Sequence, residues 1–249
     1  MSRSIKYLAE PKQLLLAWQA PDHLGDRQRW AVGVIDIAGP ECTFRYVTSD
    51  PEFRTLNGRS KDDLIALGFL GYPAFGMQRP IHRSEVLPTL MRRLPPRSRP
   101  DFGAFLQLYG LAPDANPSDF ALLAYTGAKL PSDGFSIVDP LDRSTAKADL
   151  VMEVAGTRHL LAGATLDMAP DYPVSLSPEP DNRFDPAAIR VCFSERCVGY
   201  VNRLQAETVG YWLHNRAVTA SIYRLNGTVQ NPKLFIFMSV RPKTDRIAA

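Results

Sequence analysis

The sequence predicts an α+β protein of two domains. The expected N-terminal domain, residues 1–142, combines a small antiparallel sheet with helices, and the expected C-terminal domain, residues 150–242, is a small β-barrel with one main helix. Strand-like stretches open the chain, helical periodicity replaces them from about residue 60, and strand-like stretches return after a polar linker at 139–150. A chain of 249 residues is long enough for two domains of ordinary size.

The strands of the N-terminal domain follow one another closely. Residues 12–18, 30–37 and 42–47 are rich in aliphatic and aromatic side chains, and turn-forming Pro, Asp and Gly residues separate them. Three such stretches in succession predict an antiparallel meander. A last strand is expected at 135–138.

The helices of this domain are predicted from their caps and their apolar spacing. Ser60 and Asp63 have the spacing of a capping box, which begins a short helix that ends at Gly68. In residues 102–109 apolar side chains recur at i, i+3, i+4 and i+7, the pattern of one helix face. Two further helices are expected at residues 84–94 and 118–127.

The second half is rich in strand-like stretches. They are expected at residues 149–154, 174–176, 189–193, 218–222 and 234–240, with one more short strand that ends at Tyr200. Asn202 is a favourable N-cap with Gln205 three residues on, so the main helix begins there and runs to Asn215. Asn226-Gly227 is a turn signal. Several short strands and one amphipathic helix in about 90 residues predict a small barrel.

Composition and charge narrow the classes of partner. The net charge is +3, with 18 basic and 17 acidic residues up to residue 150 and 11 and 9 after it, so a nucleic acid would need a local site. No apolar run is long enough to span a membrane, and no membrane partner is expected. Three cysteines without a CxxC motif favour a reducing, cytoplasmic setting.

Enzymatic motifs are missing from the sequence. The four histidines are scattered, and no HExxH, CxxC, P-loop or GxSxG pattern occurs. The sequence therefore predicts a protein without catalytic residues, and neither a cofactor nor a metal is expected.

The segment 179–200, EPDNRFDPAAIRVCFSERCVGY, is the most informative part of the chain. Together with Gly156-Thr157-Arg158-His159 upstream and Asn202-Arg203-Leu204 downstream, it resembles a HIRAN domain over roughly residues 151–242. The resemblance implies a small β-barrel that captures the 3′ end of single-stranded DNA. In this family such domains recruit or orient helicases and nucleases, so the resemblance implies a sensor or adaptor of DNA ends in repair or phage defence.

The resemblance also implies roles for single residues. Arg158 would pair with a phosphate, although a solvated surface arginine is an equal alternative from its spacing. His159 stands where relatives commonly carry an aromatic residue, and could stack on a base. Phe184 and Asp185 match the aromatic–acid pair that embraces the terminal nucleotide, with Asp185 accepting the 3′-hydroxyl hydrogen. Asp185 is equally suited to cap the helical turn that follows it.

Three more candidate DNA-binding residues lie at the start of the main helix. Tyr200 would stack on a base or pack beside it, and Asn202 caps the helix. Arg203 falls at the first helical position, where a cation opposes the helix dipole. That placement favours a role in binding an anion at the helix N-terminus.

The densest basic feature lies in the first half. Arg92, Arg93, Arg97 and Arg99 fall within eight residues, and they could extend a nucleic-acid path or sit at a helix C-terminus for dipole reasons. Segments 94–96 and 122–128 give this half a loose similarity to the N-terminal subdomain of HipA-type kinases. No residue role is carried over from that similarity.

Two functions follow from these observations. The first is a non-catalytic protein that binds single-stranded DNA, preferentially at free 3′ ends, and works with a helicase, nuclease or kinase partner. The alternative is a protein-interaction adaptor, or an antitoxin-like partner of a HipA-type kinase or a defence enzyme.

Overall fold

The computed structural model describes residues 3–26, 28–39, 41–130, 133–163 and 168–243. Its contacts divide the chain into two compact units. The N-terminal unit comprises Glu10–Phe102 and Asn116–Pro140, and the C-terminal unit comprises Met1–Ala9, Gly103–Ala115 and Leu141–Ala249. The expected linker at 139–150 thus contains the last change of unit, but two segments from the first 142 residues group with the C-terminal unit.

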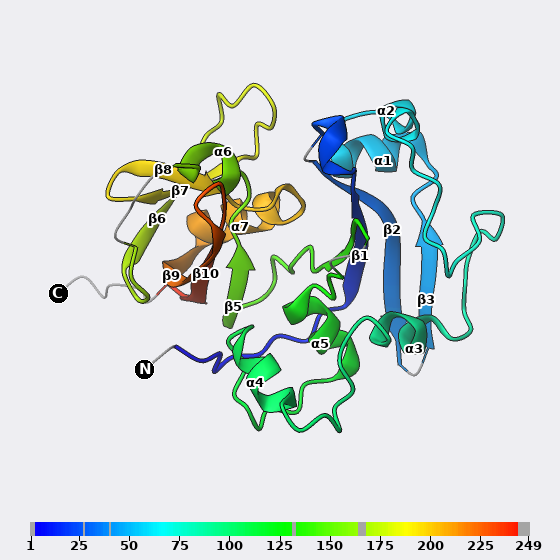
Figure 1. The fold of residues 1–249 in the computed structure, drawn as a ribbon, viewed down its shortest axis with the longest axis horizontal. Coiled ribbons are helices and arrows are strands. Elements are labelled where there is room, and N and C mark those ends of the chain that lie inside the picture. Colours follow the sequence, from blue (N-terminus) through cyan, green and yellow to red (C-terminus); the bar gives the residue numbers. More distant parts are fainter. Residues whose placement is uncertain (1–2, 27, 40, 131–132, 164–167, 244–249) are drawn as a thin grey trace. The chain divides into compact units, whose positions relative to one another are not determined.

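The N-terminal unit contains the predicted meander (Figure 1). Its strands are β1 (Gln13–Gln19), β2 (Arg29–Ala38), β3 (Glu41–Tyr46) and β4 (Phe135–Val138). The short 3-10 helix η1 (Asp22–Leu24) lies between β1 and β2. They pair antiparallel in the order β3-β2-β1-β4. Trp30 and Phe44 are fully buried in this sheet, so the aromatic residues of the strand-like stretches form the core.

Short helices accompany the sheet. They are α1 (Asp50–Asn57), α2 (Lys61–Ala66), α3 (Val86–Met91) and α5 (Asp119–Thr126), while α4 (Phe102–Gln107) begins where the chain passes into the C-terminal unit. Ser60 and Asp63 form the predicted capping box at the start of α2. Helix α1 was not predicted. It is held by the buried side chain of Asn57. The amide oxygen of Asn57 accepts the N–H of Ala31 at 2.7 Å, and its amide nitrogen donates to the Ala31 carbonyl at 3.1 Å.

The C-terminal unit is built on a six-stranded antiparallel sheet (Figure 1). Its strands are β5 (Ala148–Glu153), β6 (Pro173–Pro178), β7 (Ile189–Phe193), β8 (Arg196–Tyr200), β9 (Arg216–Thr228) and β10 (Asn231–Pro242), in the order β5-β10-β9-β6-β7-β8. Helix α6 (Thr157–Leu161) follows β5, and α7 (Arg203–Asn215) follows β8. The α+β class is confirmed.

Two details of the sheet in this unit differ from the prediction. The expected barrel is not closed: in the described residues its edge strands meet through one bridge, between Ala155 and Tyr200. The prediction of a turn at Asn226-Gly227 is wrong, because both residues pair within the β9–β10 ladder and the turn follows Thr228. Gly227 uses its positive φ of 88° inside the strand, where a Cβ would lie 2.2 Å from the Asn231 carbonyl oxygen.

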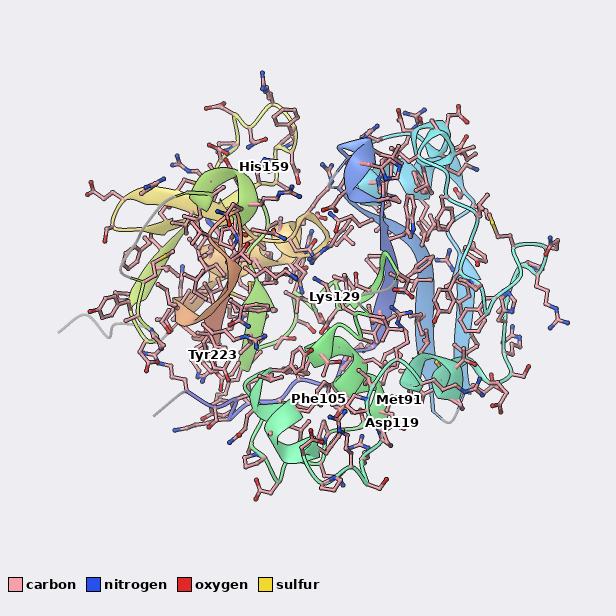
Figure 2. The ribbon with its side chains drawn as sticks, in the orientation of Figure 1. Met91, Phe105, Asp119, Lys129, His159 and Tyr223 are labelled. Carbon is pink, nitrogen blue, oxygen red and sulfur yellow. The ribbon has the colours of Figure 1, made fainter. Side chains whose placement is uncertain are left out.

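Residues from the first half are anchored to this sheet by buried polar groups. Asp149 on β5 is 1% exposed, and its carboxylate accepts the N–H groups of Lys6 and Tyr7 at 3.0 and 3.1 Å and the Arg241 guanidinium at 2.6 Å. The Tyr223 hydroxyl, labelled in Figure 2, donates to the Gln107 carbonyl at 2.5 Å. These bonds explain why 103–115 and the N-terminal segment group with the C-terminal unit.

The helices of the described residues are short. The longest, α7, has 13 residues, whereas a helix needs about 20 to cross a bilayer. None of the helices in the described part of the chain could therefore span a membrane.

Candidate nucleic-acid interface

The bridge between Ala155 and Tyr200 joins the ends of the two edge strands of the C-terminal sheet and brings two helix starts together. Ala155 N–H donates to the Tyr200 carbonyl at 2.8 Å, and Tyr200 N–H donates back at 2.9 Å. Helix α6 begins two residues after Ala155, and α7 begins three residues after Tyr200. Candidate residues on both helices therefore lie near this bridge.

Asp185 and Arg203 meet, although 18 positions separate them along the chain. Arg203 Nη1 lies 3.7 Å from Asp185 Oδ2, and the two side chains are 29% and 17% exposed. The same nitrogen donates to the Phe184 carbonyl at 3.2 Å. A partly exposed cation and a carboxylate thus share one place beside the N-terminus of α7.

A network of turn hydrogen bonds presents Phe184 and Asp185. Asn182 Oδ1 accepts both of their N–H groups, at 3.0 and 3.1 Å. Asp185 Oδ1 accepts the N–H of Ala187 at 3.0 Å, so this oxygen caps the turn as one of the two interpretations predicted. The other oxygen of the carboxylate faces Arg203, which leaves it suited to a second role.

The Phe184 ring is unusually exposed for a large apolar side chain. It is 74% exposed, and the Arg183 guanidinium lies 4.6 Å from the ring centroid. An exposed ring beside a cation offers a face on which a base can stack. Sequence reasoning did not select Arg183. Its position next to Phe184 was the available signal.

Tyr200 is held at the edge of the sheet by several neighbours. Burial raises the pKa of its hydroxyl, and Cys197 and Glu179 raise it further, partly through hydrogen bonds to the hydroxyl. Glu179 Oε2 also accepts the side-chain amide of Asn182 at 2.6 Å. Glu179 therefore joins Tyr200 to the turn that carries Phe184 and Asp185, a connection that sequence reasoning missed.

Asn202 is a positioning residue. It is 6% exposed, and its Oδ1 accepts the N–H of Leu204 at 3.2 Å at the start of α7. The predicted cap is confirmed, but a direct contact of this side chain with DNA is wrong, because its burial hides it from a ligand.

Arg158 and His159 lie on α6, where a strand end was expected. Both side chains are exposed, and His159 is labelled on this helix in Figure 2. Gly156 is the N-cap of α6, and a Cβ added to it would lie 3.8 Å from the Tyr200 ring, so α6 starts beside Tyr200. The fold thus brings α6, which carries Arg158 and His159, beside Tyr200 at the end of β8.

One arginine of the cluster in the N-terminal unit is buried and hydrogen-bonded inside the fold. Arg93 has a side chain only 4% exposed, and it donates to the carbonyls of Ala128 and Phe135 and to both oxygens of Asp133. A contact of Arg93 with a nucleic acid is therefore wrong. Its five donors are directed inward.

The other arginines of the cluster differ in exposure. Arg97 donates to Asp119 at 2.7 Å and to the Pro117 carbonyl at 2.8 Å, which ties its loop to the start of α5. Arg99 is half exposed and pairs with Asp101, and Arg92 is exposed. No continuous row of available cations results from the four.

The C-terminal unit thus presents an exposed aromatic ring, a cation–carboxylate pair and two helix starts that meet where its edge strands are bridged. Comparison with known families agrees: residues 147–241 match the HIRAN domain, so this part of the chain is a HIRAN domain. The match confirms the family predicted for the second half, and it supports a DNA-binding role.

Similarity to individual proteins is low. The crystal structure of the HIRAN domain of human HLTF is similar at 20% identity and a TM-score of 0.30, covering 37% of this chain and 74% of that one. The search of curated proteins found no match.

Proposed function

We propose that the C-terminal unit binds single-stranded DNA, preferentially at a free 3′ end, and performs no chemistry on it. The observation that supports this proposal is the Asp185–Arg203 pair beside the exposed Phe184 ring. A strand end needs an acceptor for its hydroxyl, a cation for its phosphate and a face for its base. These three groups come from one turn and the first residue of α7.

Asp185 would distinguish the end from the rest of the strand. Its Oδ2 is 3.7 Å from Arg203, longer than a hydrogen bond, so this oxygen can accept a hydrogen from a 3′-hydroxyl. An internal phosphodiester has no such donor, and a 3′-phosphate would be repelled by the carboxylate. The preference for a hydroxyl end therefore depends on one oxygen atom.

Arg203 and the aromatic rings would supply the general affinity. Arg203 stands at the N-terminus of α7, where the free N–H groups also attract a phosphate. Stacking of a base on Phe184 contributes about 1–3 kcal/mol per base in proteins of this kind. Arg158, His159 and Tyr200 lie near the Ala155–Tyr200 bridge and would contact the adjoining nucleotides.

A DNA-end sensor or adaptor in repair or phage defence is the cellular role that this site supports best. Such a protein passes the end to a partner, for which we propose a helicase, nuclease or kinase. The N-terminal unit carries exposed apolar side chains that suit a protein partner. They are Ile65, Leu70, Met77 and Ile81, of which Leu70 is 91% exposed.

The test compares labelled oligonucleotides of one sequence with a 3′-hydroxyl, a 3′-phosphate or no free end, titrated against the full chain. The parent should bind the hydroxyl end most tightly, and an RNA of the same sequence shows whether the sugar matters. Asp185→Ala should abolish the preference and leave weaker general binding. Asp181→Ala, which removes an exposed acid from the same turn, is the matched control and should keep it.

Two results would oppose the proposal. Equal binding of the three oligonucleotides by the parent removes end recognition, and no binding favours the protein-interaction adaptor. Asp185→Asn can retain the hydrogen bond to Ala187, and it replaces the alanine variant if that variant does not fold.

A further inference from the structure

We propose that Arg190 and Tyr200 form a second nucleotide subsite, which binds the phosphodiester and the base next to the terminal nucleotide. This inference rests on the proposed function, since it extends the same strand away from Asp185. Neither the resemblance nor the selection of candidate residues from the sequence had assigned Arg190 a role.

The strand register places the two side chains together. Arg190 on β7 pairs directly with Tyr200 on β8, and opposite residues in an antiparallel pair share one face of the sheet. On the other side Arg190 pairs with Ser177 of β6, which has a short side chain. The Arg190 side chain is 44% exposed.

Arg190 retains hydrogen-bonding capacity. Its Nε is buried, lies 3.8 Å from Glu179 Oε1, beyond hydrogen-bond distance, and has no hydrogen-bond partner in the described residues. A ligand would reach the other donors of the guanidinium, since the side chain as a whole is 44% exposed. Arg93, by contrast, is saturated by carbonyls and a carboxylate. The Glu179 carboxylate lies near the Arg190 guanidinium without a hydrogen bond to its Nε, so the exposed end of the guanidinium can receive a phosphate.

Glu179 also sets the spacing between the two subsites. Its carboxylate contacts Arg190, the Tyr200 hydroxyl and the amide of Asn182. Asn182 in turn holds the N–H groups of Phe184 and Asp185. One carboxylate therefore links the residues for the terminal nucleotide to those for the nucleotide before it.

The experiment measures how affinity grows with strand length. A mononucleotide, a dinucleotide and a longer oligonucleotide, all with 3′-hydroxyl ends, are titrated against the full-length parent and Arg190→Ala at several salt concentrations. The variant should lose about tenfold of the affinity that the parent gains beyond the terminal nucleotide. Its salt dependence should fall by about one phosphate contact.

Two readouts separate a subsite from a structural role. The variant should keep the parent's ratio of affinities for 3′-hydroxyl and 3′-phosphate ends, and Arg190→Lys should restore the salt dependence. Lys233→Ala, which removes an exposed cation from β10 of the same domain, should leave all values unchanged. If Arg190→Ala fails to fold, Arg190→Gln replaces it, since glutamine keeps much of the side chain and removes its charge.

The outcomes are distinct. Unchanged length dependence in Arg190→Ala overturns the subsite, and so does a loss of end preference in that variant. If the parent itself shows no end preference, the proposed function fails. If the parent shows it and Arg190→Ala binds like the parent, only the subsite fails.

Discussion

The arginines of the N-terminal unit and those of the HIRAN domain differ in how far the fold buries or pairs them. The N-terminal unit has four within eight residues, from Arg92 to Arg99, and the fold buries one and pairs two others. The HIRAN domain has no such cluster, yet Arg203 and Arg190 each lie beyond hydrogen-bond distance of the carboxylate that accompanies them, at 3.7 and 3.8 Å.

The difference shows that the density of charge along a chain does not measure the charge available to a ligand. A guanidinium has five donors, and carbonyls at the ends of helices and strands compete for them. Arg93 reaches carbonyls from two such segments, whereas Arg203 reaches one carbonyl. Availability depends on what the fold places nearby.

The largest expected effect is on the buried member of the cluster. Arg93→Ala leaves Asp133 and two carbonyls without their donor, so we expect a loss of about 3–5 kcal/mol in the free energy of unfolding. Urea denaturation measures it, with the exposed neighbour Arg92→Ala as control. Equal stability of the two variants would contradict the assignment.

The HIRAN domain also contains an arginine whose guanidinium is paired inside the fold: Arg241 donates to the buried Asp149. Burial acts to raise the pKa of this carboxyl, but hydrogen bonds from Arg241, Ser239 and two backbone N–H groups outweigh burial and lower it. Because the folded pKa lies below the unfolded value of about 3.9, this stabilisation is present above that pH. It is lost as the pH falls through the folded pKa.

Asp149→Asn should therefore cost about 1–3 kcal/mol near neutral pH, and less in acid. Urea unfolding of parent and variant across the acidic range measures the difference. A difference that stays constant as the pH falls would show that the charge of Asp149 is not what holds the N-terminal segment.

Arg203→Ala tests the available cation at the site. We expect about tenfold weaker binding of every oligonucleotide, with a salt dependence reduced by about one contact and little change in stability. Fluorescence anisotropy at several salt concentrations measures both quantities. An unchanged salt dependence would mean that Arg203 meets no phosphate.

The smallest effects are expected from the exposed part of the cluster. Arg97→Ala should cost roughly 0.2–1 kcal/mol of stability, since its pair with Asp119 is partly exposed, and Arg99→Ala less. Neither should alter DNA affinity. A clear loss of affinity in either variant would restore the cluster as a nucleic-acid path.

Much of the secondary structure could be predicted because its signals are local. Alternating apolar residues gave the strands of both sheets, and Ser60, Ser118 and Asn202 cap the helices that were expected to begin there. Asn226-Gly227 misled because the β9–β10 register continues past it. The twelve residue pairs of the β9–β10 ladder stabilise this register more than one dipeptide's preference for a turn opposes it.

The candidate site could be predicted only in part. The turn residues Phe184 and Asp185 and the helix start at Arg203 were selected from the sequence, and the fold brings them together. The burial of Asn202 and Arg93 and the central place of Glu179 were not foreseen. Each of these depends on partners from other segments, which no spacing along the chain reveals.

By itself the sequence determined where most of the strands and helices form, which segment resembles a HIRAN domain and which residues the turn at 179–188 offers. Only the tertiary structure decided that Arg93 is buried, that the N-terminal segment and 103–115 group with the HIRAN domain, and that the Ala155–Tyr200 bridge gathers the site. The reason is physical: backbone preferences depend on neighbours in the chain, whereas burial and the pairing of charges depend on neighbours in space.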